Sequence, residues 1–250
     1  MARVTGSHLI CRALKLEGVT NIFALAGDHI LPLLDVMADQ DFRLIDTRHE
    51  QAAVHMADAW GRITGQPGIC MYTTPGFANA IPGLTNAMHS EGPVISIAGC
   101  ADLADLGRGT QQEIDQVSMA VPVTKGSFMV HDARRIPDFI ARAVRLAFSG
   151  RRGPVHLTMP IDVQEQIVDE AEAAFYSAAE YRPRESTLAD PELVRRAIAL
   201  LRQARRPLVI AGSAAGYTLS GQALQKFIET TRLPVLTEEQ ARGLISDDHP

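Results

Sequence analysis

The chain has 250 residues and a formal net charge of −5, with 46% apolar and 21% charged residues, which is ordinary for a globular protein. Asp and Glu outnumber Lys and Arg (29 against 24) and aromatic residues make up only 5%, which argues against a nucleic-acid-binding surface. The apolar runs are shorter than the ~18 residues that a membrane span needs, and the N-terminus lacks a signal-peptide pattern, so we expect a cytoplasmic protein that binds no membrane.

The N-terminal part of the chain alternates between helix and strand patterns. Thr5 can cap a first helix, and Gly18 can end it. Helices are expected at 5–18, at 30–37, from Glu50 onward and at 77–89, and strands at 21–25, 42–45, 69–72 and 93–98. Repetition of strand, loop and helix predicts an α/β fold, a doubly wound parallel sheet covered on both faces.

The pattern changes after Gly99. Residues 101–109 are rich in Asp and Gly and are expected to form an exposed loop. Further elements are then expected: a short helix at 117–120, a strand near 125–130, a helix at 133–148 and a strand at 154–159. Cys11, Cys70 and Cys100 lie in apolar segments without metal-ligand spacing, so buried free thiols are expected, which fits a reducing compartment.

The chain is expected to contain two domains. Residues 165–188 lack sustained apolar periodicity and are interpreted as a linker between a domain at 1–164 and a second α/β unit at 189–250. In that second unit, helices are expected at 191–202, capped by Asp190, and at 219–231, and strands at 207–211 and 234–236. Two strands and two helices do not easily close a covered parallel sheet, so this domain is expected to be incomplete, within the N-terminal part of a longer protein.

Three polar loops follow expected strands, and the first contains Glu50. Glu50 lies where a strand passes into a helix, a place where open α/β sheets bind ligands and a helix N-terminus favours a carboxylate. The other two loops are Gly27-Asp28-His29 and Thr73-Thr74-Pro75-Gly76, and together the three have the composition of an acid/base site. A purely structural first-turn role for Glu50 remains the alternative. Neither the Thr73 loop nor 212–216 has the spacing of a dinucleotide or phosphate-binding loop.

Several short motifs occur together in a fixed order. They are Gly27, Arg48-His49-Glu50-Gln51-Ala52, Met56-Ala57-Asp58 with Thr64-Gly65, Thr74-Pro75-Gly76 with Asn79, Gln112-Glu113, and Pro122-Val123-Thr124-Lys125. In combination they resemble the pyrimidine-binding domain of thiamine diphosphate enzymes, above all the acetolactate synthase and benzaldehyde lyase group. The resemblance covers Met1 to about Asp162, and the segment after Leu188 resembles the start of that group's middle domain.

The resemblance implies a role for each matching residue. Glu50 would hydrogen-bond the aminopyrimidine ring of thiamine diphosphate and activate the cofactor, which requires a carboxyl group in a largely apolar pocket. Gln112 matches a glutamine that faces the substrate. His29 matches a catalytic histidine of benzaldehyde lyase and Asp28 an aspartate of the pyruvate decarboxylase type; we favour His29, as a proton shuttle, because loop neighbours usually point in different directions. The residues implied in cofactor binding are Gly27, Glu50, Thr73, Thr74, Pro75, Gly76 and Asn79.

The sequence also departs from the family pattern. The usual Thr-Ser-Gly-Pro-Gly loop is here Thr73-Thr74-Pro75-Gly76, one residue shorter, which puts the backbone contact near the pyrimidine in doubt. The paired histidines of decarboxylases are replaced by Gly99-Cys100-Ala101-Asp102, which weakens simple decarboxylation as the reaction. The Gly-Asp-Gly and Asn-Asn motif that holds Mg²⁺ and the diphosphate is absent, so these ligands belong to a third domain and no metal ligand is expected in this chain.

The function implied is that of a thiamine diphosphate-dependent carboligase or lyase acting on 2-keto acids, aldehydes or acyloins. A 2-keto acid or acyl-CoA decarboxylase is an alternative, and whether FAD binds stays open. Active sites of this fold form between two copies of the chain, which implies a dimer at least and favours a tetramer; the 250 residues alone are expected to be inactive. Two other hypotheses are an inactive or regulatory fragment, since the diphosphate site is missing, and a domain that binds another nucleotide, which leaves the Arg48-to-Gln51 motif unexplained.

Overall fold

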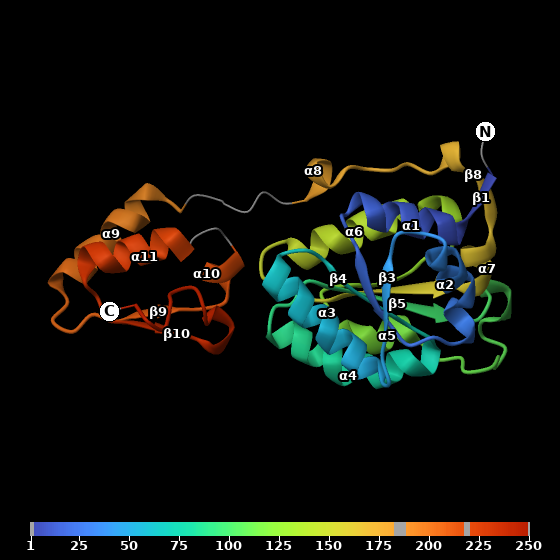
Figure 1. Cartoon of the computed structure of the whole chain (residues 1–250), viewed down its shortest axis with the longest axis horizontal. Coiled ribbons are helices and arrows are strands. Elements are labelled where there is room, and N and C mark those ends of the chain that lie inside the picture. Colours follow the sequence, from blue (N-terminus) through green and yellow to red (C-terminus); the bar gives the residue numbers. More distant parts are fainter. Residues whose placement is uncertain (1–2, 183–188, 218–220, 250) are drawn as a thin grey trace. The chain divides into compact units, whose positions relative to one another are not determined.

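The computed structural model describes residues 3–182, 189–217 and 221–249. The chain divides into two compact units, Met1–Pro183 and Arg184–Pro250 (Figure 1). None of the helices in the described part of the chain has both the length and the apolar character needed to cross a lipid bilayer.

The first unit is built on a six-stranded parallel sheet with strand order β3-β2-β4-β5-β7-β6 (Figure 1). The strands are β2 (Asn21–Ala24), β3 (Arg43–Asp46), β4 (Gly68–Tyr72), β5 (Val94–Cys100), β6 (Ser127–Met129) and β7 (Val155–Pro160). The three central strands β4, β5 and β7 are buried along their whole length, as strands covered on both faces must be. The predicted parallel sheet is confirmed.

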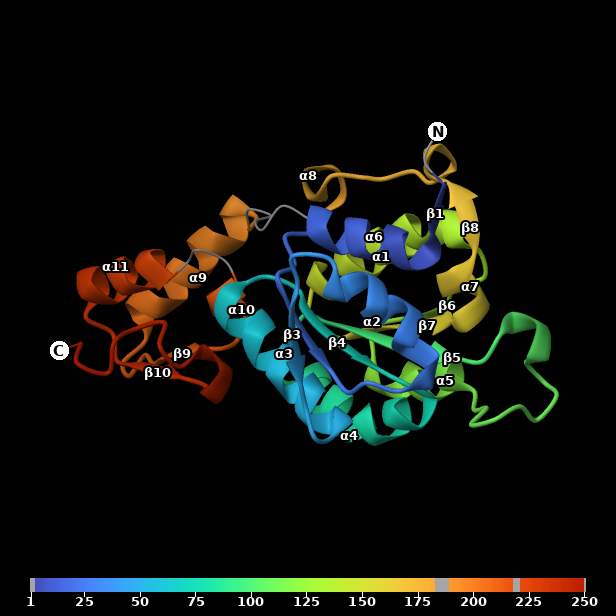
Figure 2. The same ribbon diagram turned by 45° about the vertical axis from the view of Figure 1, so that its right-hand side comes forward.

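Helices cover both faces of this sheet (Figures 1 and 2). They are α1 (Gly6–Leu16), α2 (Leu31–Ala38), α3 (Glu50–Thr64), α4 (Thr74–His89), α5 (Gln116–Ala120), α6 (Ile136–Phe148) and α7 (Ile161–Glu165), with short 3₁₀ turns at Asp28–Ile30, Leu103–Asp105, Val121–Val123, Ala133–Arg135 and Glu170–Glu172. Buried side chains of α1, α2 and α6 share one apolar cluster with Met71 of β4, whereas those of α3 and α4 share another with Tyr72. Alternate residues of one strand therefore serve two cores, which makes the sheet doubly wound.

Glycines let α3 and α4 approach closely. A Cβ at Gly83 would lie 2.8 Å from Cβ of Val54, and a Cβ at Gly76 would lie 2.7 Å from Oε1 of Glu50. A larger side chain at either position would push the two helices apart. At the start of α3, the Nδ1 atom of His49 accepts a hydrogen bond from the Gln51 backbone N–H at 3.2 Å, which caps the helix.

The segment Thr73-Thr74-Pro75-Gly76 differs from the loop expected there. α4 begins at Thr74, so three of these residues form its first turn. Proline is compatible with a first helical turn because the N–H group that it lacks has no partner inside the helix there. The expected start at Phe77 is therefore three residues late.

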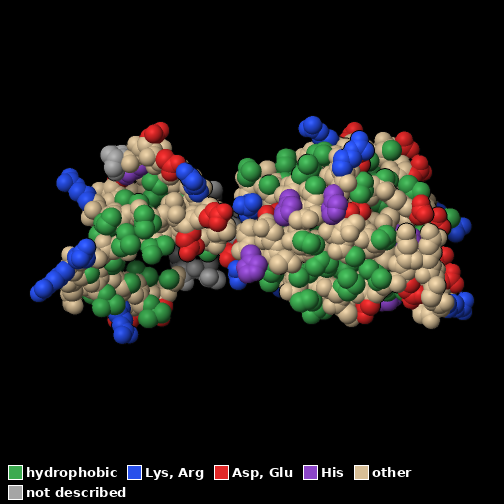
Figure 3. All heavy atoms as spheres, turned by 90° about the horizontal axis from the view of Figure 1, so that it is seen from below, with side chains coloured by type: hydrophobic (Ala, Val, Ile, Leu, Met, Phe, Trp, Pro, Cys, Tyr) green, Lys and Arg blue, Asp and Glu red, His purple; other side chains and the backbone are tan. Residues whose placement is uncertain are grey.

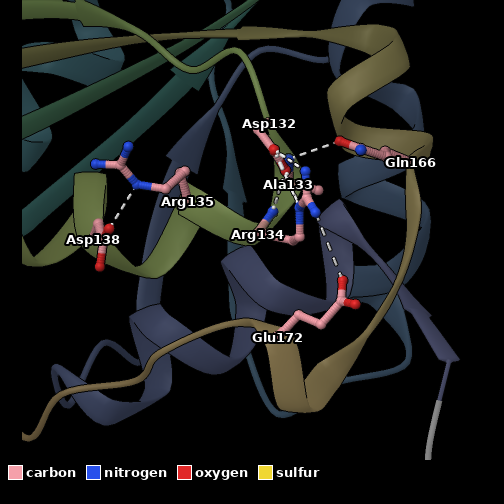
Figure 4. Close-up of polar contacts among 7 residues, drawn as sticks. All are labelled: Asp132, Ala133, Arg134, Arg135, Asp138, Gln166 and Glu172. Atoms are coloured by element: carbon pink, nitrogen blue, oxygen red, sulfur yellow. Dashed lines mark hydrogen bonds and ion pairs between the residues drawn. The ribbon is translucent and has the colours of Figure 1, made fainter.

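Part of the segment expected as a linker carries regular structure. β8 (Ile167–Asp169) pairs antiparallel with β1 (Arg3–Thr5), and α8 (Ala178–Tyr181) follows. Figure 4 shows contacts of the residues next to β8: Gln166 Oε1 accepts a hydrogen bond from the Ala133 N–H at 2.7 Å, and Glu172 lies 3.9 Å from Arg134. These polar contacts hold residues 166–172 against the rest of the first unit. The strand was not expected because three residues are too few to leave a periodic signal in the sequence. The expected end of this segment, at 183–188, lies outside the described residues.

The second unit contains the two strands and the flanking helices that were expected. β9 (Val209–Ala211) and β10 (Val235–Thr237) pair in parallel, with α9 (Pro191–Gln203) and α11 (Gly221–Thr231) beside them. The Asp190 side chain caps α9, as predicted, by accepting a hydrogen bond from the Glu192 N–H at 2.7 Å. The 212–216 loop differs, because it contains the start of a short helix, α10 (Ala214–Tyr217); a 3₁₀ turn follows at Glu239–Ala241, and the helix start expected at Leu219 lies outside the described residues.

Candidate active site

Glu50 lies at the carboxyl edge of the sheet as the first residue of α3. Its side chain is 9% exposed, and its Oε2 atom accepts a hydrogen bond from Nδ2 of Asn79 on α4 at 3.0 Å. Oε1 faces Gly76 and has no hydrogen-bond partner among the described residues. The close α3–α4 contact thus buries a carboxyl group and leaves one of its oxygens available to a ligand.

His29 lies beside the ends of the neighbouring strands. It is 6% exposed, and its Nδ1 atom lies 3.1 Å from Oγ1 of Thr74 and 3.5 Å from the Thr74 backbone nitrogen. Its carbonyl oxygen accepts a hydrogen bond from Nε2 of Gln164 at 2.8 Å. Gly99 of β5 packs directly on the His29 backbone. Burial lowers the pKa of His29, against an opposing effect of Asp28, so the ring is neutral near pH 7.

The structure gives the two loop neighbours different positions. Asp28 is exposed, whereas His29 is buried against Thr74. Gly27 is extended and approaches Thr73 so closely that an added Cβ would lie 2.5 Å from Thr73 Cγ2. Gly27, Thr73 and Thr74 are therefore brought together with His29, while Pro75 is exposed on the first turn of α4.

Gln112 lies on the loop that follows β5. It is exposed, with φ of +60°, and no hydrogen bond joins it to Glu50 or His29 within the described residues. The neighbouring Glu113 carboxylate accepts hydrogen bonds from the backbone N–H groups of Gly107, Gly109 and Thr110, and the Gly107 bond above all lowers the pKa of this carboxyl group. This folded loop and Met129 line a cavity of about 740 Å³, at whose wall Gln112 stands.

A chain of buried polar side chains runs behind His29, and the sequence reasoning missed it. Gln116 Nε2 donates to Thr74 Oγ1 at 2.8 Å and to the Gly99 carbonyl oxygen at 3.0 Å. The chain continues through the contacts Gln116–Thr158 (3.2 Å), Thr158–His156 (3.0 Å), His156–Ser96 (2.9 Å) and Ser96–Tyr72 (2.5 Å). A signal was present: Ser96, His156 and Thr158 are polar residues inside otherwise apolar strands, and 156 and 158 share one face.

His156 predicts an acid-sensitive fold. Complete burial lowers the pKa of His156 from 6.5 to about 3, so between these values the unfolded chain binds a proton that the folded chain excludes. Stability is therefore lost as the pH falls below about 6.5, by up to about 1.4 kcal/mol for each pH unit from this group alone. Urea denaturation at pH 7 and pH 5 measures this loss. The variant His156→Gln should show a shallower pH dependence than the wild type, and equal slopes would contradict the assignment.

Cys11, Cys70 and Cys100 are buried and free, as predicted, and burial raises the pKa of each thiol to about 12. These thiols are therefore protonated at neutral pH and are poor nucleophiles. Within the described residues, no group of three or more His, Cys, Asp or Glu side chains could hold a metal ion.

Two family models match this chain. The model described as "Thiamine pyrophosphate enzyme, N-terminal TPP binding domain" matches residues 4–119, and "Thiamine pyrophosphate enzyme, central domain" matches residues 194–250. The first match includes Glu50, Gly76 and Asn79, and also His29 and Gln112.

Three similar curated proteins align with 98% of the chain. A probable acetolactate synthase large subunit of Methanocaldococcus jannaschii is 33% identical over 249 residues, which is 42% of its own length. Oxalyl-CoA decarboxylase of Escherichia coli is 36% identical over 248 residues, and 2-hydroxyacyl-CoA lyase of Arabidopsis thaliana is 34% identical over 250 residues, each 44% of that protein's length. The chain thus spans less than half the length of these relatives. Together with the two family models, they show that the chain belongs to the thiamine pyrophosphate enzyme family, of which it carries the N-terminal and central-domain segments.

Proposed function

We propose that this protein is a carboligase or lyase that uses thiamine diphosphate to form or cleave carbon–carbon bonds in 2-keto acids, aldehydes or acyloins. The observation that supports this function is the buried Glu50 carboxyl group: Oε2 is held by Asn79, and Oε1 faces Gly76 without a hydrogen-bond partner in the described part of the chain. Similarity to acetolactate synthase and 2-hydroxyacyl-CoA lyase over nearly the whole chain agrees with this class of reaction.

The residues at this edge fit an aminopyrimidine ring. Glu50 Oε1 is a free carboxyl oxygen in a largely dehydrated position, and the absence of a side chain at Gly76 leaves it uncovered. We propose that Glu50, Gly76 and Asn79 hold the ring, with Gly27, Thr73, Thr74 and Pro75 forming the adjoining wall. When bound, the cofactor supplies the electron sink for carbon–carbon bond chemistry.

The chain's own residues then hold and direct protons. In this proposal the free oxygen of the Glu50 carboxyl group would hydrogen-bond the ring and exchange a proton with it. Asn79 orients the carboxyl group by donating to the other oxygen. Buried, neutral His29 is proposed as the proton shuttle, in preference to the exposed Asp28. Gln112 is proposed to contact the substrate from the cavity wall.

The remaining assignments extend this proposal. The diphosphate and Mg²⁺ would be held by a domain beyond these residues, and FAD binding by the central domain stays an option. The proposed domains are a pyrimidine-binding domain at 1–164, a linker at 165–188 and the central domain from 189. The three free thiols suit a reducing cytoplasm.

A second copy of the chain is the proposed partner, in a dimer or tetramer. Apolar side chains of α3, of α5 and of the turn after α5 are exposed, among them Met56, Ile63, Met119 and Val121. Figure 3 shows a face of the first unit on which apolar side chains are gathered. Exposed apolar patches of this kind mark interaction surfaces.

A decarboxylase acting on acyl-CoA thioesters or 2-keto acids is the second candidate. The 36% identity to an oxalyl-CoA decarboxylase favours it. The absence of paired histidines after β5 speaks against a simple 2-keto acid decarboxylase. Product analysis with a 2-keto acid and with an acyl-CoA thioester separates the candidates: release of CO₂ without a new carbon–carbon bond supports the second.

Calorimetric titration with thiamine diphosphate and Mg²⁺ tests the proposed function. We expect the full-length protein to bind the cofactor, and the 250-residue chain to bind it weakly or not at all, because the diphosphate ligands lie elsewhere. Failure of the full-length protein to bind would overturn the function and favour an inactive or regulatory role.

A further inference from the structure

The buried hydrogen bonds behind His29, from Ser96 to Gln116, have a defined donor-to-acceptor direction. We propose that Gln116 is a positioning residue that acts through Thr74 to hold neutral His29 in the tautomer with its proton on Nε2. The inference rests on the proposed function in one respect, namely that His29 works in the active site. Gln116 is thereby assigned the positioning of His29, and His29 the role of a hydrogen-bond donor through Nε2.

The orientation of the Gln116 amide follows from its partners. The Gly99 carbonyl oxygen can only accept a hydrogen bond, and it lies 3.0 Å from Nε2 of Gln116, so the amide nitrogen must face it. The second N–H of this amide points to Thr74 Oγ1 at 2.8 Å. Gln116 Oε1 is then directed to Thr158, which donates its hydroxyl proton at 3.2 Å. Each polar atom of the buried Gln116 side chain therefore has a partner.

The hydrogen bonds of Thr158, His156 and Ser96 agree with this direction. Because Thr158 donates to Gln116, its oxygen accepts from Nε2 of His156, at 3.0 Å. The single proton of neutral His156 then lies on Nε2, and Nδ1 accepts from the Ser96 hydroxyl at 2.9 Å. Hydrogen bonds thus run one way from Ser96 to Gln116, and the Gln116 amide is locked from both sides.

The hydrogen bonds of Thr74 determine the tautomer of His29. The Thr74 hydroxyl accepts a hydrogen bond from Gln116, and its own proton is directed to Gly99 O at 3.0 Å or to His29 Nδ1 at 3.1 Å. The Thr74 backbone N–H also points at His29 Nδ1, at 3.5 Å. Because Gln116 already donates to Gly99 O, the Thr74 hydroxyl proton is directed to Nδ1. Nδ1 then faces two donors from Thr74, the hydroxyl and the weaker backbone N–H, so it is the acceptor and the imidazole proton lies on Nε2.

Nε2 is the ring atom of His29 that a substrate can reach. It has no hydrogen-bond partner among the described residues, and it is not among the buried atoms that lack one, so it keeps contact with solvent. His29 therefore presents an N–H donor, which suits an oxygen atom that gains negative charge during carbonyl chemistry. In this resting state the ring donates a hydrogen bond from Nε2.

Histidine tautomers can be measured directly by NMR. Long-range ¹H–¹⁵N spectra of the full chain labelled with ¹⁵N-histidine, with the His29 signals assigned from a His29→Asn variant, should show an unprotonated Nδ1 and a protonated Nε2. In Gln116→Met, Gly99 O loses a donor and the Thr74 hydroxyl can donate to it while accepting from His29 Nδ1–H. The Nδ1-protonated form should then become populated. Gln116→Leu serves in the same way if Gln116→Met does not fold.

Two further variants separate the proposed path from general loosening of the core. The double variant Gln116→Met/Thr74→Val lacks the hydroxyl that would accept from Nδ1–H but keeps the backbone N–H donor, so the Nε2 tautomer should return. Ser96→Ala removes a buried hydroxyl at the other end of the chain and should leave His29 unchanged. A His29 protonated on Nδ1 in the wild type, or a folded Gln116 variant with an unchanged tautomer, would overturn the inference.

Kinetics of the full-length protein distinguish this inference from the proposed function. Gln116→Met should lower kcat by about tenfold with little change in KM, because it removes a hydrogen bond that matters as charge develops on the substrate. Cofactor binding should not change. If the protein binds no thiamine diphosphate and yet shows the Gln116-dependent tautomer, the proposed function fails and the positioning role of Gln116 stands.

Discussion

Replacing Glu50 with Gln should slow proton exchange at C2 of thiamine diphosphate, bound to the full-length protein, by about 10²–10⁴-fold, the usual contribution of a positioned acid or base. The side chain keeps its size, and its carbonyl oxygen can still accept the Asn79 hydrogen bond. What it loses is the ability to exchange a proton with the ring. Deuterium exchange into the cofactor, followed by quenching and NMR, measures this rate without any substrate.

The controls separate proton exchange from binding. Asn79→Ala leaves the Glu50 carboxyl group in place without its partner and should slow exchange much less than Glu50→Gln. Calorimetry should show that Glu50→Gln still binds the cofactor, since most of the binding contacts lie elsewhere. Wild-type exchange in a cofactor-loaded Glu50→Gln protein would remove Glu50 from the mechanism.

Replacing Gly99 with Ala should destabilise the first unit by at least ~3 kcal/mol, at the upper end of the usual cost of overpacking. The new Cβ would lie 2.0 Å from the carbonyl oxygen of His29 and 2.8 Å from its Cβ. These are mostly backbone contacts, and Gln164 also holds the His29 carbonyl, so the segment cannot simply move aside. Urea denaturation followed by circular dichroism measures the change.

Gly216→Ala is the matched control for this substitution. Its Cβ would lie 3.7 Å from Leu244 Cδ2, which is an ordinary contact, so little loss of stability is expected. If Gly99→Ala is as stable as the wild type, the contact between β5 and the His29 segment is looser than described. A stable Gly99→Ala protein with an altered His29 tautomer would show instead that the strain is relieved by moving His29.

The sheet was predictable because its signal is local. β4, β5 and β7 are mostly apolar runs, and the intervening helices have apolar faces, so their order alone indicated a parallel sheet with two covered faces. The boundaries at Thr74 and at β8 were missed because a first helical turn with proline reads like a loop and a strand of three residues has no period.

The candidate site was predictable only in part. Glu50 and His29 follow strands, and strand ends meet at one edge of a parallel sheet, so their neighbourhood could be inferred. The different directions of Asp28 and His29 were expected, but the contacts that bury His29 could not be inferred, because Thr74 and Gly99 lie far along the chain. Gln116 was missed for the same reason: its three side-chain hydrogen bonds are to residues of α4, β5 and β7, all far from it in sequence.

The close contact of α3 and α4 has a mechanical consequence. Glu50 and Asn79 lie on two helices that pack closely at Gly76 and Gly83. The carboxyl group and its hydrogen-bond partner are therefore held in one rigid helix pair. Gln112 stands on the loop after β5, which is exposed over most of its length and is held mainly by hydrogen bonds to Glu113. In the proposed active site, adjustment to substrates of different size is therefore expected from this loop, while Glu50 and Asn79 keep a constant geometry.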